Sequence, residues 1–94
     1  MQTFILFGKY TTEGLKGMSA ERTDAAVDAI EKCGGEVQAM YATLGQHDLV
    51  FILSFPSMED AIKCSVFLAR MTGIAFTTAP AVTVQQFDQL MAET

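Results

Sequence analysis

The sequence predicts an α+β domain in which a four-stranded antiparallel sheet carries its helices on one face. Strand-forming segments alternate with helix-patterned segments in the order βαββαβ, and one more helix pattern follows. The first and third strand segments are apolar on both alternating faces, which is typical of central strands that are covered on both sides. The fourth contains Pro80, which confines it to a sheet edge because proline cannot donate to a strand ladder.

Size and composition indicate one domain over residues 1–94, with more apolar surface than so small a domain is expected to bury. The chain has 94 residues, which leaves no room for a second domain. Half of the residues are apolar and 18% are charged, an apolar-rich ratio for so small a globule. We therefore expect some of the apolar surface to face a partner.

Charge and hydropathy exclude several classes of partner. The formal net charge is -5, and the six lysines and arginines are spread singly along the chain. This composition argues against nucleic acid and against anionic membranes as partners. No apolar run approaches the roughly 18 residues of a membrane span, and the first residues lack the basic start of a secretory signal. The expected location is the cytoplasm.

The first half of the chain predicts a strand, a helix and a hairpin. The strand covers Thr3–Gly8, and the helix covers Leu15–Lys32 and ends at Gly34–Gly35. The hairpin joins strands Val37–Thr43 and Leu49–Phe55. The helix is predicted from apolar residues at helical intervals, namely Leu15, Met18, Ala26, Ala29, Ile30 and Cys33.

Two residues in these segments, Arg22 and Gly45, have specific structural requirements. Arg22 falls inside the apolar helix stripe, so it either extends its charged end to water or needs an anionic partner, for which Asp48 is a candidate. Gly45, in the hairpin turn, is expected to supply the positive φ that a tight strand connection requires.

The second half predicts a helix, an edge strand and a terminal helix. Ser57 is expected to cap a helix that runs to about Thr72, with one face on the sheet and a second strip in need of a neighbour. The sheet-facing residues are Met58, Ala61, Ile62, Ser65, Leu68 and Ala69, and the second strip is Cys64, Phe67 and Met71. A strand over Ile74–Ala81 and a short helix opened by a capping box at Thr83 follow; Val84, Phe87, Leu90 and Met91 share one face of this helix.

This order is the ferredoxin-like arrangement with right-handed crossovers, in which both helices cover the same sheet face. The other face, formed by alternate residues of Phe4–Phe7 and Leu49–Phe55, would then be left in water. Monomers rarely expose a contiguous apolar patch of that kind. We therefore expect a homodimer, or a higher homo-oligomer, in which two sheets pack face to face around a solid or hollow core.

The order of elements, the double glycine before the second strand and the turn Gly45–Asp48 together resemble the GYD domain family. The resemblance covers nearly the whole chain. It implies a dimeric α/β barrel, a fold shared with cofactor-independent monooxygenases and isomerases, and it implies no defined biochemical role. The family is named for a glycine, a tyrosine and an aspartate, which correspond here to Gly45, His47 and Asp48, so a histidine stands where the family usually has tyrosine.

The candidate site residues are polar groups that this fold could bring together. His47 beside Asp48 is suited to acid–base chemistry, although Asp48 could equally cap the turn. The candidate catalytic residues are His47, Asp48 and Arg22, and the candidate ligand-binding residues are Tyr10, Arg22, Tyr41, His47 and Asp48.

The sequence contains no spaced ligand set for a metal and no cofactor motif, so we expect neither. Cys33 and Cys64 lack CxxC spacing and are interpreted as small core hydrophobes.

Three functions fit these observations, and one of them, a purely structural assembly unit, is compatible with a sealed core. The other two involve a ligand or a substrate. The first is a dimeric module that binds a small, mostly apolar molecule or serves a regulatory role. The alternative is a small cofactor-independent enzyme, monooxygenase- or isomerase-like, that uses His47 with Asp48 or Arg22. The binding module is favoured because an enzyme should show more convergent polar groups.

Overall fold

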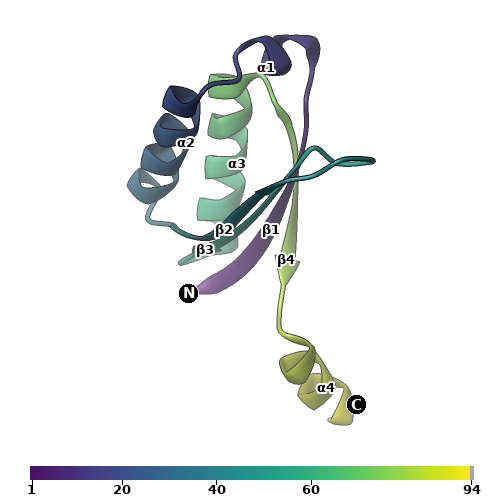
Figure 1. The fold of residues 1–94 in the computed structure, drawn as a ribbon. Helices are drawn as coiled ribbons and strands as arrows, with labels where there is room; N and C mark the ends of the chain where they lie inside the picture. Colours follow the sequence, from purple (N-terminus) through teal and green to yellow (C-terminus); the bar gives the residue numbers. More distant parts are fainter. Residues whose placement is uncertain (94) are drawn as a thin grey trace.

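The computed structural model describes residues 1–93 and has the predicted ferredoxin-like α+β architecture (Figure 1). The sheet order is β2-β3-β1-β4, and every neighbouring pair is antiparallel. The two doubly apolar strands are central and the proline-containing strand is an edge, as predicted. The elements are β1 (Gln2–Lys9), α1 (Thr12–Lys16), α2 (Ala20–Lys32), β2 (Glu36–Ala42), β3 (Leu49–Phe55), α3 (Met58–Thr72), β4 (Ala75–Ala81) and α4 (Val84–Ala92).

The first helical segment is broken in two, so the prediction of one helix over 15–32 is wrong. Gly17 ends α1, where its N–H donates to the Glu13 carbonyl. Ser19 is extended and starts α2, because its Oγ accepts a hydrogen bond from the Arg22 N–H at 3.0 Å. The apolar spacing matched one helix, but the local capping chemistry specifies two.

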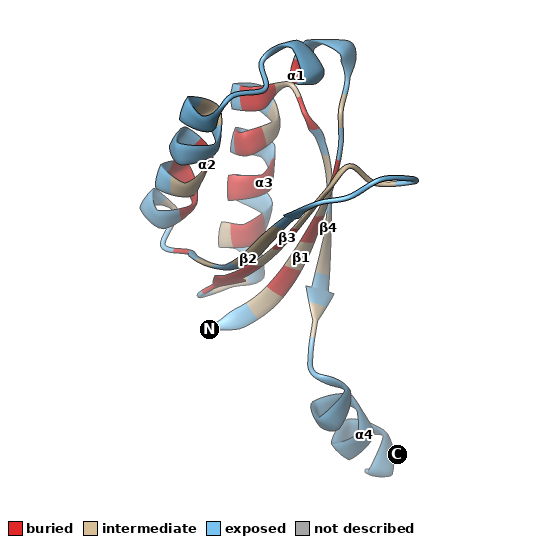
Figure 2. Cartoon of the chain, in the orientation of Figure 1, coloured by how far each residue is buried: buried red, intermediate tan, exposed pale blue. Residues whose placement is uncertain are grey.

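Both long helices, α2 and α3, pack on one face of the sheet (Figures 1 and 2). The buried core between the layers holds alternate residues of the two central strands and the inner faces of the helices. Its largest fully buried members are Phe4, Leu6, Ile30, Leu53, Phe55 and Leu68. The rings of Phe4 and Phe55 meet edge to face with centroids 6.1 Å apart.

The orientation of α3 differs from the prediction. Met58 and Ile62 were expected on the sheet, yet each is 52% exposed, whereas Cys64 is fully buried. The buried stripe of α3 consists largely of small side chains, which let the helix approach the sheet closely: Ala61, Cys64, Ser65, Leu68 and Thr72. Burial raises the pKa of the Cys64 thiol to about 12, and a hydrogen bond with Cys33 adds to the rise. Cys64 is therefore a core side chain.

The opposite sheet face carries apolar side chains that neither long helix covers. The register of β1 and β3 pairs Ile5 with Ile52 and Phe7 with Val50 on this face. Ala79 of β4 and Ala39 of β2 extend it to the two edges. We call these six residues the open face. All six are partly exposed in the single chain.

Helix α4 extends away from the sheet and lies outside the core (Figures 1 and 2). The predicted capping box is present, with Thr83 and Gln86 bonded reciprocally. Helix α4 contains no buried residue, and it packs extensively against no other described helix or strand. The second strip of α3 is therefore not covered by the last helix of the same chain. No helix within residues 1–93 is long and apolar enough to cross a membrane.

We expect Gly45→Ala to lower the free energy of unfolding by about 1 kcal/mol or more. Gly45 has a φ of +123°, and a Cβ there would meet nothing within 4 Å, so the cost comes from the backbone conformation alone. Gln46→Ala, at the neighbouring exposed position, is the control and should be near neutral. Urea denaturation measures both variants, and an unchanged midpoint for Gly45→Ala would contradict the turn geometry.

Candidate functional site

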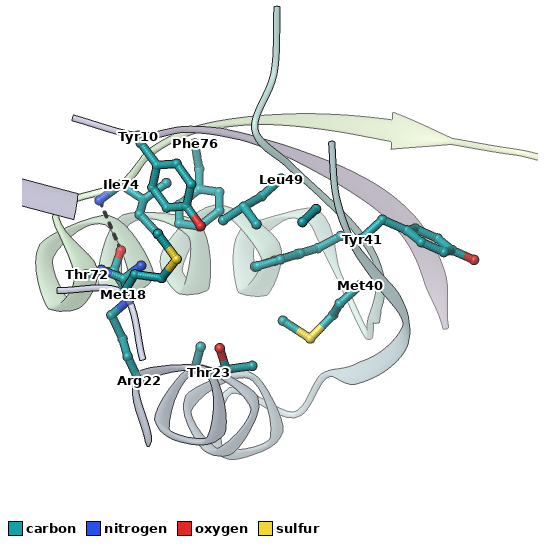
Figure 3. A pocket seen from close by; sticks show the side chains of 13 residues that line it. Tyr10, Met18, Arg22, Thr23, Met40, Tyr41, Leu49, Thr72, Ile74 and Phe76 are labelled. Atoms are coloured by element: carbon teal, nitrogen blue, oxygen red, sulfur yellow. Dashed lines mark hydrogen bonds between the residues drawn. The ribbon is translucent and has the colours of Figure 1, made fainter. Parts of the chain in front are cut away.

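A cavity of about 210 Å³ lies at one end of the core, between the sheet, the helix α2 and the break that precedes it (Figure 3). Its wall is mainly apolar, with a few polar groups near Tyr10 and Arg22. Pockets of this composition suit small molecules that are held by shape and oriented by few polar contacts. The principal apolar side chains of the wall are Met18, Met40, Leu49, Phe51, Ile74 and Phe76.

The break between α1 and α2 places two of the lining side chains. Met18 lies in the break itself and Arg22 lies in the first turn of α2, and both line the cavity. Gly14, in α1, is buried with a would-be Cβ 3.1 Å from the Gly73 carbonyl oxygen, so α1 fits against the chain after α3 only because this residue lacks a side chain. Thr11 Oγ1 also donates to the Gly73 carbonyl at 2.6 Å. The short helix α1 is thus held against Gly73, in the connection between α3 and β4.

The Arg22 guanidinium is oriented by two neighbours at the cavity. Its Nη1 donates a hydrogen bond to the Gly14 carbonyl, and its Cζ lies 6.0 Å from the centre of the Tyr10 ring. The distance to the ring is within the range of a cation–π contact. A guanidinium has five N–H groups, so a bond to Gly14 still leaves donors for an anionic ligand.

Asp48 fastens the hairpin to the end of β1. Its Oδ2 accepts a hydrogen bond from the Tyr10 N–H at 2.8 Å and lies 3.5 Å from Lys9 Nζ. Its own N–H donates to the Gly8 carbonyl at 2.8 Å. These contacts fix the backbone where β1 delivers Tyr10 to the cavity.

The suggested ion pair between Arg22 and Asp48 does not form. In the described part of the chain, the ion pair within 4.0 Å is that of Lys9 with Asp48. Arg22 is satisfied by a backbone carbonyl, which the sequence could not indicate because that partner depends on the unpredicted break between the helices.

His47 and Asp48 diverge, as neighbours in an extended segment do. The His47 ring stacks on Phe7 of the open face, with ring centroids 4.7 Å apart and planes tilted by 35°. Asp48 turns toward β1 instead. The pair therefore does not present both side chains to the cavity.

Tyr41 borders the cavity, but its ring is directed away from it (Figure 3). The register pairs Tyr41 with Val50, which places its side chain on the open face, where it is 58% exposed. The structure thus brings together Tyr10 and Arg22 of the five candidates, with Asp48 behind the Tyr10 backbone. His47 and Tyr41 lie on the other face of the sheet.

Sequence reasoning missed the apolar lining of the cavity, because such residues are indistinguishable from core residues in a single sequence. The useful signal was local: Gly17 followed by Ser19 marks a helix end and a new N-cap, and this break places Met18 at the cavity. In residues 1–93, no three His, Cys, Asp or Glu side chains gather in a way that could hold a metal ion.

Comparisons with known proteins agree with this architecture. The family model of the GYD domain matches residues 4–91. A crystal structure of Mycobacterium tuberculosis leucine response regulatory protein (LrpA) superposes with a TM-score of 0.58 at 11% sequence identity. The match covers 87% of this chain and 51% of that one, so this chain spans about half its length, and the likeness shows the fold alone. Among curated proteins, no sequence matches.

We expect Asp48→Ala to lower the free energy of unfolding by about 1–2 kcal/mol, because the partly buried Tyr10 N–H loses its acceptor. Asp48→Asn keeps an acceptor oxygen and should cost less, since the exposed ion pair with Lys9 is worth under about 1 kcal/mol. Denaturant titration measures both. Equal losses in the two variants would show that the charge, rather than the hydrogen bond, carries the effect.

The effects of Arg22→Met and Asp48→Asn should add in the double variant to within about 0.5 kcal/mol, since the two side chains have different partners. Unfolding free energies of the singles and the double measure the coupling. If the double variant loses less free energy of unfolding than the two single variants lose together, Arg22 and Asp48 interact, and the absence of an ion pair would be contradicted.

Proposed function

The chain belongs to the GYD domain family, and from this membership together with the cavity we propose that it is a homodimeric binding module. It binds one small, mostly apolar molecule per chain between the sheet and the helix α2, and it serves a regulatory role. The observation that carries the proposal is the apolar cavity with a positioned arginine at its wall.

The cavity defines the class of ligand. A volume of about 210 Å³ is below the roughly 300–1,000 Å³ of sites for drug-sized molecules, so the ligand is small. The methionine and aromatic wall favours an aliphatic or aromatic body. Arg22 favours a carboxylate or another anionic acceptor, because a charge-assisted hydrogen bond is about twice as strong as a neutral one.

The regulatory part of the proposal is supported by the fold. The LrpA structure, whose title names a leucine response regulatory protein, shares this architecture over most of the chain. In our proposal the domain senses a small molecule and transmits occupancy through its dimer contacts. The rearrangement would start at Met18, in the break between α1 and α2, and at Ile74, after α3, which both line the cavity.

Geometry favours binding over catalysis. The enzyme alternative relied on His47 with Asp48 or Arg22 as reacting groups. The His47 ring stacks on Phe7 across the sheet from the cavity, and the Asp48 carboxylate is engaged with the Tyr10 N–H and with Lys9. Arg22 and Tyr10 can orient a ligand, but none of the described residues that line the cavity with them is an Asp, Glu or His that could act as a general base. The proposal therefore requires no cofactor.

The proposed dimer is formed by the open face. Ile5, Phe7, Val50 and Ile52 provide a continuous apolar centre, and the alanines of the edge strands allow close approach of a second sheet. A second copy fits because the open face is apolar and uncharged, and the second copy carries the same face. We propose further that residues 1–94 act as a single domain in the cytoplasm.

We expect 4-methylpentanoate to bind the wild-type protein and to shift the amide signals of Tyr10, Met18 and Ile74 in ¹H–¹⁵N NMR spectra. Arg22→Met should raise the dissociation constant at least about tenfold, equivalent to about 1.4 kcal/mol. The neutral amide of the same acid is the control ligand, and its affinity should change little. Shifts confined to other regions, or no shifts at millimolar concentration, would rule out the cavity as this site.

A second expectation concerns the open face. Ile52→Asp places a carboxylate at its centre and should abolish the sheet-to-sheet contact, which lowers the mass of the assembly, or prevent folding. Ile62→Asp is the matched control, because Ile62 is half exposed on the outer side of α3 and its replacement should leave the dimer intact. Sedimentation velocity with circular dichroism separates loss of assembly from loss of fold. A folded Ile52→Asp variant with the same mass in solution as the wild-type protein would contradict the proposed interface.

A further inference from the structure

Helix α4 is amphipathic, and its apolar side is exposed to solvent. Val84, Phe87 and Leu90 lie on this side, and each is at least half exposed. The helix is well capped, so it is a formed element rather than a frayed tail. A short helix of nine residues, about 14 Å long, gains little stability alone and normally depends on packing. The side chains therefore indicate a docking surface.

The C-terminal segment is also acidic. From residue 75 to residue 94 the sequence contains Asp88 and Glu93 and neither lysine nor arginine. At 100° per residue, Asp88 lies beside the apolar side of α4, while Gln85 and Gln89 lie opposite it. A surface that receives this helix should combine apolar contact with positive charge.

Such a surface is present on the outer side of the helix layer. A groove of about 560 Å³ runs between α2 and α3, and Ala29, Val66 and Phe67 give it apolar walls. Lys32, Lys63 and Arg70 also line it. Three of the six basic residues of the chain thus gather at one groove of a protein with net charge -5.

The one acidic residue that lines the groove offsets only part of this positive charge. Asp60 lines the groove at its α3 end, and its Oδ2 already accepts a hydrogen bond from the Ser57 hydroxyl at 2.8 Å. Asp60 also lies in the first turn of α3, where a carboxylate is favoured by the helix dipole. It therefore has a local structural role, and the charged side chains of the groove, three cations and one carboxylate, keep a positive sum for a partner.

We propose that α4 of one chain docks, apolar side inward, in the α2–α3 groove of a second copy of this chain. The arrangement is a helix-in-groove contact, with Val84, Phe87 and Leu90 as anchors spaced by three residues. Asp88 then lies near the basic rim. Complementary charge orients the helix, and burial of Phe87 and Leu90 provides the main favourable free energy.

The occupant is a second copy because the connection to α4 is short. Two residues, Val82 and Thr83, separate β4 from α4, so the Cα atoms of Ala81 and Val84 are at most about 11 Å apart. To reach the groove of its own chain, α4 would have to pass from the sheet to the outer side of the helix layer and also cross α3, which lies over β4 and is about 10 Å across with its side chains. An α4 helix from another molecule meets no such constraint.

The contact is also separate from the proposed sheet-to-sheet interface. The groove lies on the helix layer, and the open face lies on the opposite side of the sheet. Docking of α4 in the groove of a second chain is a heterologous contact, because two different surfaces meet. It therefore joins dimers into rings or larger assemblies. Its failure would therefore leave the proposed dimer and the cavity unaffected.

Cys33 lines the groove and provides a direct test by cross-linking. One chain carries Cys33→Ser, Cys64→Ala and Leu90→Cys, and a second, tagged chain carries Cys64→Ala and keeps Cys33. The mixture is oxidised with glutathione disulfide and analysed on non-reducing gels. We expect a mixed disulfide between the two chains. Gln89→Cys, on the polar side of α4, replaces Leu90→Cys in the control and should react at least about tenfold more slowly.

A mixed disulfide that fails to form, or that forms equally from both positions, would overturn the proposal. So would an intrachain disulfide as the sole product of a chain that carries both Cys33 and Leu90→Cys.

Charge reversal gives an independent test. Wild-type protein should sediment as a species larger than a dimer, and Lys63→Glu with Arg70→Glu should reduce it to the dimer. Adding Asp88→Lys should restore part of the larger species. Circular dichroism confirms that each variant is folded. If the mass of the assembly does not change on charge reversal, the proposal would be overturned.

Discussion

The structure depends on one constraint: β1 and β3 are apolar on both faces, but both long helices cover the same face. The covered face holds the core, with Phe4, Leu53 and Phe55 fully buried. The other face exposes Ile5, Ile52 and their neighbours, which favours burial against a partner at about 25 cal/mol per Å² of apolar surface. The assembly we propose follows from this imbalance rather than from any motif.

The cavity and the turn are linked through the same central strand. Asp48 joins the hairpin to the end of β1 by bonding to the backbone of Gly8 and Tyr10, and this position presents Tyr10 to the cavity. The break between α1 and α2 supplies Arg22 from the other side. Asp48 therefore affects the site by positioning Tyr10. His47, in the same turn, stacks on Phe7 of the open face.

Local chemistry and strand patterns made much of the fold predictable. The central strands followed from their doubly apolar faces, and the caps at Ser57 and Thr83 and the positive φ of Gly45 followed from residue type. The rotation of α3 could not be predicted, because small residues such as Ala61 and Cys64 gain their place from tertiary packing. The site was half predictable: Tyr10 and Arg22 meet at the cavity, but its apolar wall resembles ordinary core.

The mass of the wild-type protein in solution tests the central claim most directly. Sedimentation velocity at tens of micromolar should show no 10.2 kDa species, because the open face is covered by a second copy at this concentration. A folded 10.2 kDa monomer with ordinary thermal stability would show that the face tolerates water, and the account of the assembly would be wrong.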